Sequence, residues 1–320
     1  MMLHRRISHT ADLDGLASAS LMIRKFLKSN EPFMIFLRDY EDESEVIPSA
    51  LLNISGDCSI YISDISIMLK GFDKILEKIS KINGKVLWTD HHEYSKENFE
   101  RLKELGVELL IDPAAPAAAM LVAKRYNLND EQSGMIVEMA TQADTWKVKE
   151  ERVMDLVNLI DYYNYLEKRD LQRPRLTALS YILAQYDMEN LPSEDMRIII
   201  NYYNQAKEKA FEKVLSTSTE IMINGLRLRF ALSPNIISGT QAADLLIKSF
   251  NADVYVVIKE DGGVSFRRGR DDIDLSKIAV LFGGGGHAYA SGASLGIKIN
   301  DDNFKQIVAE MTRRISESLK

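Results

Sequence analysis

The sequence has almost no cysteine and no long hydrophobic run, and each absence excludes a class of protein. A single cysteine, Cys58, rules out an internal disulfide bond and a zinc site built from several thiolates. No apolar stretch approaches the length of a membrane-spanning helix, and the first residues lack the pattern of a secretory signal peptide. We therefore expect a cytoplasmic protein that does not act in a membrane.

A positive net charge is also missing. The 320 residues include 40 Lys and Arg against 47 Asp and Glu, a net charge of -7, which argues against electrostatic binding of long duplex DNA over the whole surface. Residues 221–320 hold 13 basic and 11 acidic side chains, so residues 1–220, with 27 and 36, are the acidic part. An acidic part suits metal ions and a mildly basic part suits an anionic ligand, although two ordinary solvated surfaces explain the count equally well.

Short apolar runs alternate with helical patterns in the first part of the chain. The runs have the length and continuity of buried parallel strands; they are residues 3–7, 33–37, 60–62, 86–88 and 107–111. Apolar residues at helical spacing lie between them, at 16–27, 70–82 and 95–105. This alternation predicts an α/β fold with a doubly wound parallel sheet.

The remaining chain is first helical and then mixed. Residues 193–219 contain neither Gly nor Pro, which is typical of one long helix. Further strands are predicted at 226–231, 254–258 and 263–267, with helices near 240–250, 275–282 and 303–319. We therefore predict a first domain at 1–190, a connector helix at 191–220 and a smaller α/β domain with a mixed sheet at 221–320.

Polar clusters follow three predicted strands and one helix. The clusters are His9 with Asp12 and Asp14, Asp64, Asp90 with His91 and His92, and Asp144. Because the carboxyl ends of parallel strands share one edge of a sheet, the first three clusters should converge. Each cluster by itself is weak evidence, since an Asp after a strand can cap a helix and a His pair can be structural.

Convergence would bring four carboxylates together. Those of Asp12, Asp14, Asp64 and Asp144 would repel one another, and two divalent cations would balance their charges. Carboxylate and imidazole ligands without thiolate suit Mn²⁺ or Mg²⁺ better than structural zinc. Two such ions roughly 3.5–4 Å apart can share a hydroxide and bind a phosphoryl group during in-line attack.

A run of four glycines, residues 283–286, precedes His287. Because glycines cost backbone entropy, such a run marks the close approach of a ligand or of another chain segment, and its amides can hold an anion. A flexible loop is the alternative. The run is neither a P-loop, since no Lys-Ser or Lys-Thr pair follows, nor a dinucleotide-binding fingerprint.

These motifs together resemble the DHH phosphoesterase superfamily with its DHH-associated C-terminal domain. The resemblance extends over nearly the whole chain in the family's order, from His9 to the Gly284-Gly285-Gly286-His287 motif. It is closest to the compact nano-RNases and oligoribonucleases, which are RecJ-like but lack the extra domains of RecJ. Two departures stand out: only Thr10 and Ala11 separate His9 from Asp12, and residues 113–119 are Pro and Ala where many relatives carry a Ser-Thr pair.

The resemblance implies a role for each residue. It implies a site for two Mn²⁺ ions, with Mg²⁺ as the other candidate, in a DHH catalytic domain at 1–190, and substrate binding by residues 221–320. Asp90 would orient a ligand, and His92 would face the scissile phosphate. One ion would be held by His9, Asp12 and Asp64, and the other by Asp14, His91, Asp144 and the bridging Asp64. A substrate phosphate would be bound by Arg267, Gly284, Gly285, Gly286 and His287.

We therefore expect a Mn²⁺-dependent phosphodiesterase or exonuclease that hydrolyses short oligonucleotides, either nano-RNA or short single-stranded DNA, to nucleoside monophosphates. The alternatives in the same chemistry are a 3′-phosphoadenosine 5′-phosphate phosphatase, a cyclic-dinucleotide phosphodiesterase and a pyrophosphatase. A non-catalytic nucleotide-binding subunit of a repair complex is the alternative of another class. The expected partners are short single-stranded oligonucleotides or nucleotides; a homodimer is compatible with the sequence, which leaves cleavage polarity and preferred length open.

Overall fold

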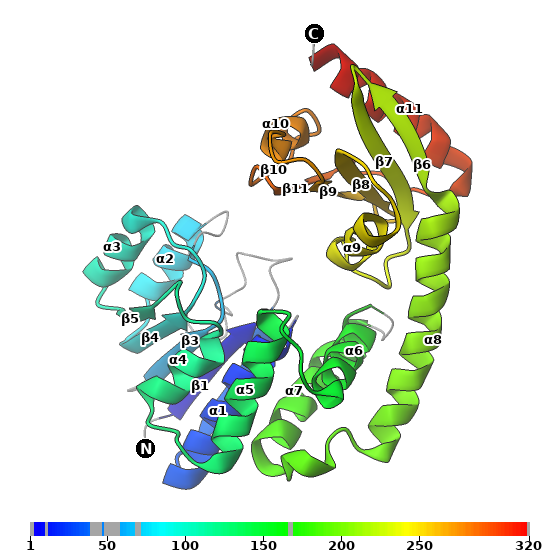
Figure 1. The fold of residues 1–320 in the computed structure, drawn as a ribbon. Coiled ribbons are helices and arrows are strands. Elements are labelled where there is room, and N and C mark those ends of the chain that lie inside the picture. Colours follow the sequence, from blue (N-terminus) through cyan, green and yellow to red (C-terminus); the bar gives the residue numbers. More distant parts are fainter. Residues whose placement is uncertain are drawn as a thin grey trace. The chain divides into compact units, whose positions relative to one another are not determined.

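The protein divides into two compact units, Met1–Ile200 and Asn201–Lys320, each with its own sheet (Figure 1). The computed structural model describes residues 3–9, 12–38, 47, 58–67, 72–165 and 169–318. Within these residues, every helix is too short or too polar to cross a membrane.

The sheet of the first unit has five parallel strands in the order β2-β1-β3-β4-β5. The strands are β1 (Leu3–His9), β2 (Phe33–Arg38), β3 (Cys58–Ser63), β4 (Gly84–Asp90) and β5 (Glu108–Ile111). They confirm the five predicted strands and the α/β fold class. Because the order reverses between β1 and β3, the carboxyl ends of these two strands form the switch point at which open α/β sheets bind ligands.

Helices cover both faces of this sheet, as expected of a doubly wound fold. Successive side chains of β3 point to opposite faces, so Ile60 and Ile62 belong to one core and Tyr61 to the other. The first core includes α2 (Phe72–Ser80) and α3 (Lys96–Glu104). The second includes α1 (Leu13–Ser29), α4 (Ala118–Arg125), α5 (Glu131–Asp144), α6 (Glu151–Tyr165) and α7 (Arg169–Gln185). The helices predicted from residues 16 to 105 are confirmed, although the start of the one at 70–82 lies outside the described residues.

A single long helix, α8 (Glu194–Thr217), contains the division between the two units. Ile200, near its start, packs in the core of the first unit, and Val214, near its end, packs in the second unit. The long helix predicted at 193–219 is therefore confirmed. The separate roles assigned to residues 1–190, 191–220 and 221–320 stay predictions.

The second unit has a six-stranded mixed sheet in the order β10-β11-β9-β8-β7-β6, in which only β7 and β8 pair in parallel. Its elements are β6 (Thr219–Ile223), β7 (Leu226–Ser233), α9 (Gly239–Ser249), β8 (Val254–Lys259), β9 (Gly263–Arg268), α10 (Leu275–Val280), β10 (Gly285–Gly286), β11 (Ala290–Ser294) and α11 (Asp301–Ser318). The sequence did not predict β6, β10 or β11. Strands β10 and β11 consist of Gly, Ala and Ser, which have little intrinsic preference for strands.

Gly15 allows α1 to begin directly against the end of β1. A Cβ atom at this position would lie 2.3 Å from the carbonyl oxygen of His9, which is backbone and cannot rotate away. Gly134 in α5 is the contrasting case, because no heavy atom lies within 4 Å of its Cβ position. The tight start of α1 brings Asp12 and Asp14 next to the last residue of β1.

We expect Gly15→Ala to lower the free energy of unfolding by about 1–3 kcal/mol, since overpacking forces the backbone to shift. Gly134→Ala is the matched control and should raise stability by about 0.5–1 kcal/mol, because alanine is favoured over glycine within a helix. Urea unfolding followed by circular dichroism measures both changes. A Gly15→Ala protein as stable as the parent would contradict the close approach.

Candidate metal centre

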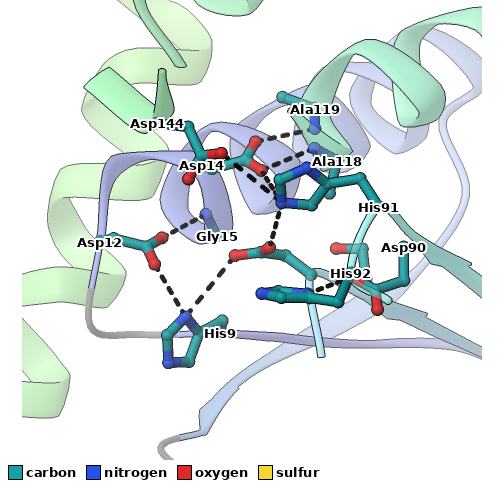
Figure 2. A network of polar contacts seen from close by, with 12 residues as sticks. His9, Asp12, Asp14, Gly15, Asp90, His91, His92, Ala118, Ala119 and Asp144 are labelled. Carbon is teal, nitrogen blue, oxygen red and sulfur yellow. Dashed lines mark hydrogen bonds and ion pairs between the residues drawn. The ribbon is translucent and has the colours of Figure 1, made fainter. Parts of the chain in front are cut away.

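The predicted polar clusters converge at the carboxyl edge of the first sheet (Figure 2). His9 and Asp90 end β1 and β4, while Asp12 and Asp14 lie at the start of α1 and Asp144 ends α5. Three groups place their donor atoms within 4.8 Å of one another: His9 with Asp12 and Asp64, Asp14 with His91 and Asp144, and Asp64 with His91 and His92. Asp90 joins through His92, so every residue expected at this edge is present.

Asp12 is both a helix cap and a member of the cluster. One carboxylate oxygen, Oδ1, accepts a 2.9 Å hydrogen bond from the amide of Gly15 and so caps α1. The other, Oδ2, lies 3.0 Å from Nδ1 of His9. Burial raises the pKa of Asp12, but the charge and hydrogen bond of His9 hold it below its ordinary value. The capping interpretation is therefore correct, and it leaves one oxygen for the cluster.

Asp14 caps a second helix, α4, from a distance in sequence. Its carboxylate accepts hydrogen bonds from the amides of Ala118 and Ala119 at 2.6 and 2.8 Å. The N-cap of α4 is Ala117, whose own side chain makes no capping hydrogen bond. The alanine run that replaces the Ser-Thr pair of many relatives therefore contributes backbone amides instead of hydroxyls. We did not anticipate this contact from the sequence.

Asp64 has a geometry suited to bridging two cations. It is 2% exposed, and its backbone is in the left-handed region at φ 53°. Its Oδ2 lies 3.6 Å from Nδ1 of His9 and its Oδ1 lies 3.7 Å from Nε2 of His91, both too long for hydrogen bonds. In the described part of the chain, no hydrogen bond reaches Oδ2. The two oxygens thus face two different groups of ligands.

The ring of His91 turns its Nε2 atom toward three carboxylates. Its Nδ1 lies 3.3 Å from the carbonyl oxygen of Ala115, which can only accept, so Nδ1 carries the proton. Nε2 lies 3.6 Å from Oδ2 of Asp14 and 3.7 Å from Oδ2 of Asp144. These separations exceed hydrogen bonds but match the roughly 3–4 Å between ligand atoms that share one ion. A cation fits this arrangement, because it would attract all the facing atoms at once.

The pKa values of the clustered groups show how strongly the carboxylates repel one another. Burial, together with the charges of Asp64 and Asp12, raises the pKa of Asp14 well above its ordinary value. Burial and the charge of Asp12 raise the pKa of Asp64 to about 6. Burial lowers the pKa of His9, but Asp12 and Asp64 outweigh it and raise the pKa to about 11. Without cations, protons must therefore balance the charge, and divalent ions would displace them.

His92 and Asp90 form a pair at the side of the cluster. Oδ1 of Asp90, which is 1% exposed, lies 2.8 Å from Nδ1 of His92. Burial lowers the pKa of His92, but the hydrogen bond and charge of Asp90 raise it to about 9. His92 is therefore held as a cation near neutral pH, with its ring oriented by Asp90 and partly open to solvent.

Arg6 is a charged residue of this region that the sequence analysis did not identify. It lies in β1 and is 1% exposed. Burial lowers its pKa to about 9, while Tyr126 and the nearby carboxylates of Asp64 and Asp14 act in the opposite direction. Arg6 thus places a buried positive charge close to the carboxylates of the cluster. The sequence did contain an indication of this charge, because Arg5 and Arg6 interrupt the strand at 3–7 that was predicted to be buried.

The predicted phosphate-binding residues of the second unit lie on and next to β9 and β10, two strands that are separated by β11. Arg267 of β9 is opposite Ala290 of β11, and Ala290 in turn exchanges backbone hydrogen bonds of 2.8 and 3.3 Å with His287. Directly paired residues project to the same face of a sheet, so Arg267 and His287 share one face. Burial lowers the pKa of Arg267, whose Nη2 donates to Oγ1 of Thr240 at 2.8 Å.

The glycine run has a structural explanation at two positions. A Cβ on Gly284 would lie 2.0 Å from the carbonyl oxygen of Gly292, and one on Gly286 would lie 2.7 Å from Cα of Ser291. Close approach of β11 therefore requires these glycines, whereas Gly285 has open space around it. The segment pairs as a strand rather than forming a flexible loop. Ligand binding by residues 284–286 stays a prediction.

Comparisons with known proteins agree with this fold. The DHHA1 domain family matches residues 229–317. Oligoribonuclease NrnB of Bacillus subtilis strain 168 is 23% identical over 268 residues, a match that covers 80% of this chain but 63%, less than two thirds, of the relative.

Two solved structures share the fold over nearly all of this chain. The pGpG-specific phosphodiesterase PggH from Vibrio cholerae has a TM-score of 0.60 at 15% identity, covering 98% of this chain and 99% of its own. RecJ from Thermus thermophilus in complex with Mn²⁺ has a TM-score of 0.62 at 12% identity, covering 98% of this chain and 52% of its own. At these identities the likeness concerns the fold.

The protein thus combines a parallel α/β unit, a mixed-sheet unit and an Asp-His cluster at the switch point of the first sheet. Residues 229–317 match the DHHA1 domain family, and the chain is similar in sequence to the curated relative and in fold to the two solved structures.

We expect Mn²⁺ to bind more tightly as the pH rises from 6 to 8, because protons held by His9 and Asp64 must leave first. The affinity should rise by up to about tenfold per pH unit for each displaced proton. Isothermal titration calorimetry at pH 6, 7 and 8 measures this dependence. Asp64→Asn should weaken binding at every pH, whereas Glu104→Gln, an exposed control on α3, should not. A pH-independent affinity would contradict the proposed displacement.

Proposed function

We propose that this protein is a metal-dependent phosphodiesterase or exonuclease that hydrolyses short oligonucleotides to nucleoside monophosphates. The observation that carries this proposal is the cluster of Asp14, Asp64, Asp144 and His91, whose facing atoms are arranged for cations rather than for one another. The names of the similar proteins support it, since they describe an oligoribonuclease, a pGpG-specific phosphodiesterase and RecJ.

In this proposal, His9, Asp12 and Asp64 hold one cation, and Asp14, Asp64, His91 and Asp144 hold the other. Mn²⁺ is the proposed ion, since the ligands are oxygen and imidazole and since the RecJ structure was solved with Mn²⁺. Bound cations would supply the charge that attracts phosphoryl oxygens and the acidity that activates water. The side chains fix the positions of the ions through their own supports: the amides of Ala118 and Ala119 for Asp14, and the Ala115 carbonyl for His91.

His92 has a direct role in this proposal. The Nδ1–H of His92 donates a hydrogen bond to Asp90, so the Nε2–H of the imidazolium can donate to a phosphoryl oxygen as negative charge develops on it. In the second unit, Arg267, His287 and the glycines 284–286 are proposed to bind a phosphate of the nucleotide.

A linear dinucleotide is a particular candidate substrate. The PggH structure matches this chain over nearly its whole length in both directions, which favours a substrate of the pGpG kind over a long polynucleotide. Hydrolysis of 3′-phosphoadenosine 5′-phosphate, the alternative activity, is tested by assaying this nucleotide beside the labelled oligonucleotides. A cytoplasmic location and a homodimer stay predictions.

We expect activity on 5′-labelled RNA and DNA of two to 24 nucleotides to vanish in EDTA and to return with Mn²⁺ more than with Ca²⁺. Asp144→Asn should lower kcat by at least about a hundredfold, because it removes a charged ligand of the proposed site. Circular dichroism should show that the variant stays folded, since Asp144 is partly exposed at a helix end. Full activity of Asp144→Asn, or activity after thorough chelation, would overturn the proposal.

His287→Ala and Arg267→Ala should act mainly on KM. Each removes a charge-assisted contact worth about 1.5–3 kcal/mol, so kcat/KM for a dinucleotide should fall roughly ten- to a hundredfold. Bis(p-nitrophenyl) phosphate has no second phosphate to bind, so both variants should hydrolyse it at nearly the parent rate.

His92→Ala is the contrasting variant and should lower kcat on both substrates. Michaelis–Menten kinetics of the three variants on both substrates separate the roles. If His287→Ala abolishes generic diesterase activity as completely as Asp144→Asn, His287 takes part in the chemical step.

A further inference from the structure

Trp146 has an unusual backbone conformation. Five described residues other than glycine have a positive φ, and three of them are Asn: Asn30, Asn127 and Asn224. Asparagine adopts the left-handed region readily, whereas a bulky residue there carries steric strain. The other two are Asp64, at the centre of the cluster, and Trp146, with φ 52°. Strain of this kind persists when the surrounding structure enforces it, and it gathers at functional sites.

Trp146 lies beside the candidate metal centre. It comes two residues after Asp144, so their Cα atoms are at most about 7 Å apart. The indole is 58% exposed, in contrast to Trp88, which is fully buried in the sheet. Lys147 and Lys149, on the same loop, are exposed as well. A residue with a large apolar ring is thus open to solvent two positions after Asp144, with exposed cationic residues on the same loop.

Hydrogen bonds fix the chain on both sides of Trp146. Before it, the amides of Thr145 and Trp146 donate to carbonyl oxygens of α5 at 3.1 and 3.2 Å. After it, the buried side chain of Gln142 accepts from the amides of Lys149 and Glu150 at 2.8 and 3.3 Å. The backbone from which the indole projects is therefore held in a fixed place, which lowers the entropy cost of contact with a ligand.

We propose that Trp146 is a base-stacking residue, which binds the nucleobase of a nucleotide whose phosphate lies at the metal centre. The inference rests on the proposed function and adds the surface that recognises the base. Every nucleobase has a face that stacks on an aromatic ring, and such stacking contributes about 1–3 kcal/mol per base. Glycine or asparagine would form the same turn without strain, so the turn alone does not explain the tryptophan.

Fluorescence offers a test that does not depend on turnover. The chain has two tryptophans, and the buried Trp88 donates to the carbonyl oxygen of Ile65, so the red edge of the emission reports Trp146. With Mg²⁺ present, GMP should quench this emission along a saturating curve, while ribose 5-phosphate, which has no base, should not. Binding of GMP detected by calorimetry without any change in this emission would overturn the inference.

Substitutions then measure the contact. Trp146→Asn suits the left-handed backbone and removes the ring, whereas Trp146→Phe keeps an aromatic face. We expect Trp146→Asn to raise KM for a dinucleotide about ten- to a hundredfold and Trp146→Phe to stay within about threefold of the parent. The melting temperature and Mn²⁺ affinity of Trp146→Asn should be unchanged or higher, which separates the loss of the ring from damage to Asp144.

A substrate with one missing base completes the comparison. Removing one base from the dinucleotide should raise the KM of the parent protein about as much as Trp146→Asn raises the KM for the intact dinucleotide. The two increases should not add when the variant is tested on the abasic substrate. Hydrolysis with an unchanged KM in Trp146→Asn would overturn the stacking and leave the proposed function standing. If the protein hydrolyses no oligonucleotide and also does not bind GMP, both the stacking and the proposed function are overturned.

Discussion

Mutual repulsion among carboxylates at one sheet edge is the constraint on which the rest of this structure depends. Asp14 and Asp64 are almost fully buried beside Asp12, and this arrangement is stable only if positive charge is supplied. Protons on His9 and on the acids balance part of the negative charge. The buried guanidinium of Arg6, which interacts with Asp64 and Asp14, adds further positive charge. The supporting contacts, from the amides of α4 to the carbonyl next to His91, hold the groups where a cation would attract them all.

Much of the first unit could be predicted because its strands are continuous apolar runs. Three of the five runs are followed directly by site residues, so the rule that parallel strands end at one edge was sufficient to bring Asp12, Asp64 and His91 together. The roles implied for these residues came from the family resemblance and not from spacing. Strands β10 and β11 were missed because Gly, Ala and Ser form them only through pairing, β10 with β11 and β11 with β9, and local sequence does not reveal these contacts.

The features that escaped prediction are contacts between distant segments and backbone angles. No local pattern indicates that Asp14 caps α4, that Gln142 fixes the loop after α5, or that Trp146 has a positive φ. The glycine run is a prediction that the structure confirms in part. It was interpreted as a mark of close approach by a ligand or by another chain segment, and the segment is what the structure contains at Gly284 and Gly286. The run of glycines in the sequence shows that these positions need a residue without a side chain, but only the atoms packed against them show the reason.

The contact between Asp14 and α4 also has a consequence for how the protein is made. Its partners are 104 and 105 residues apart, and Asp144 lies still further along the chain. Closing such long loops is slow and has an entropy cost that only the finished core can offset. A chain growing on the ribosome therefore cannot assemble this centre until α5 has emerged, so its charged residues spend early synthesis in water and come together only as the first unit closes.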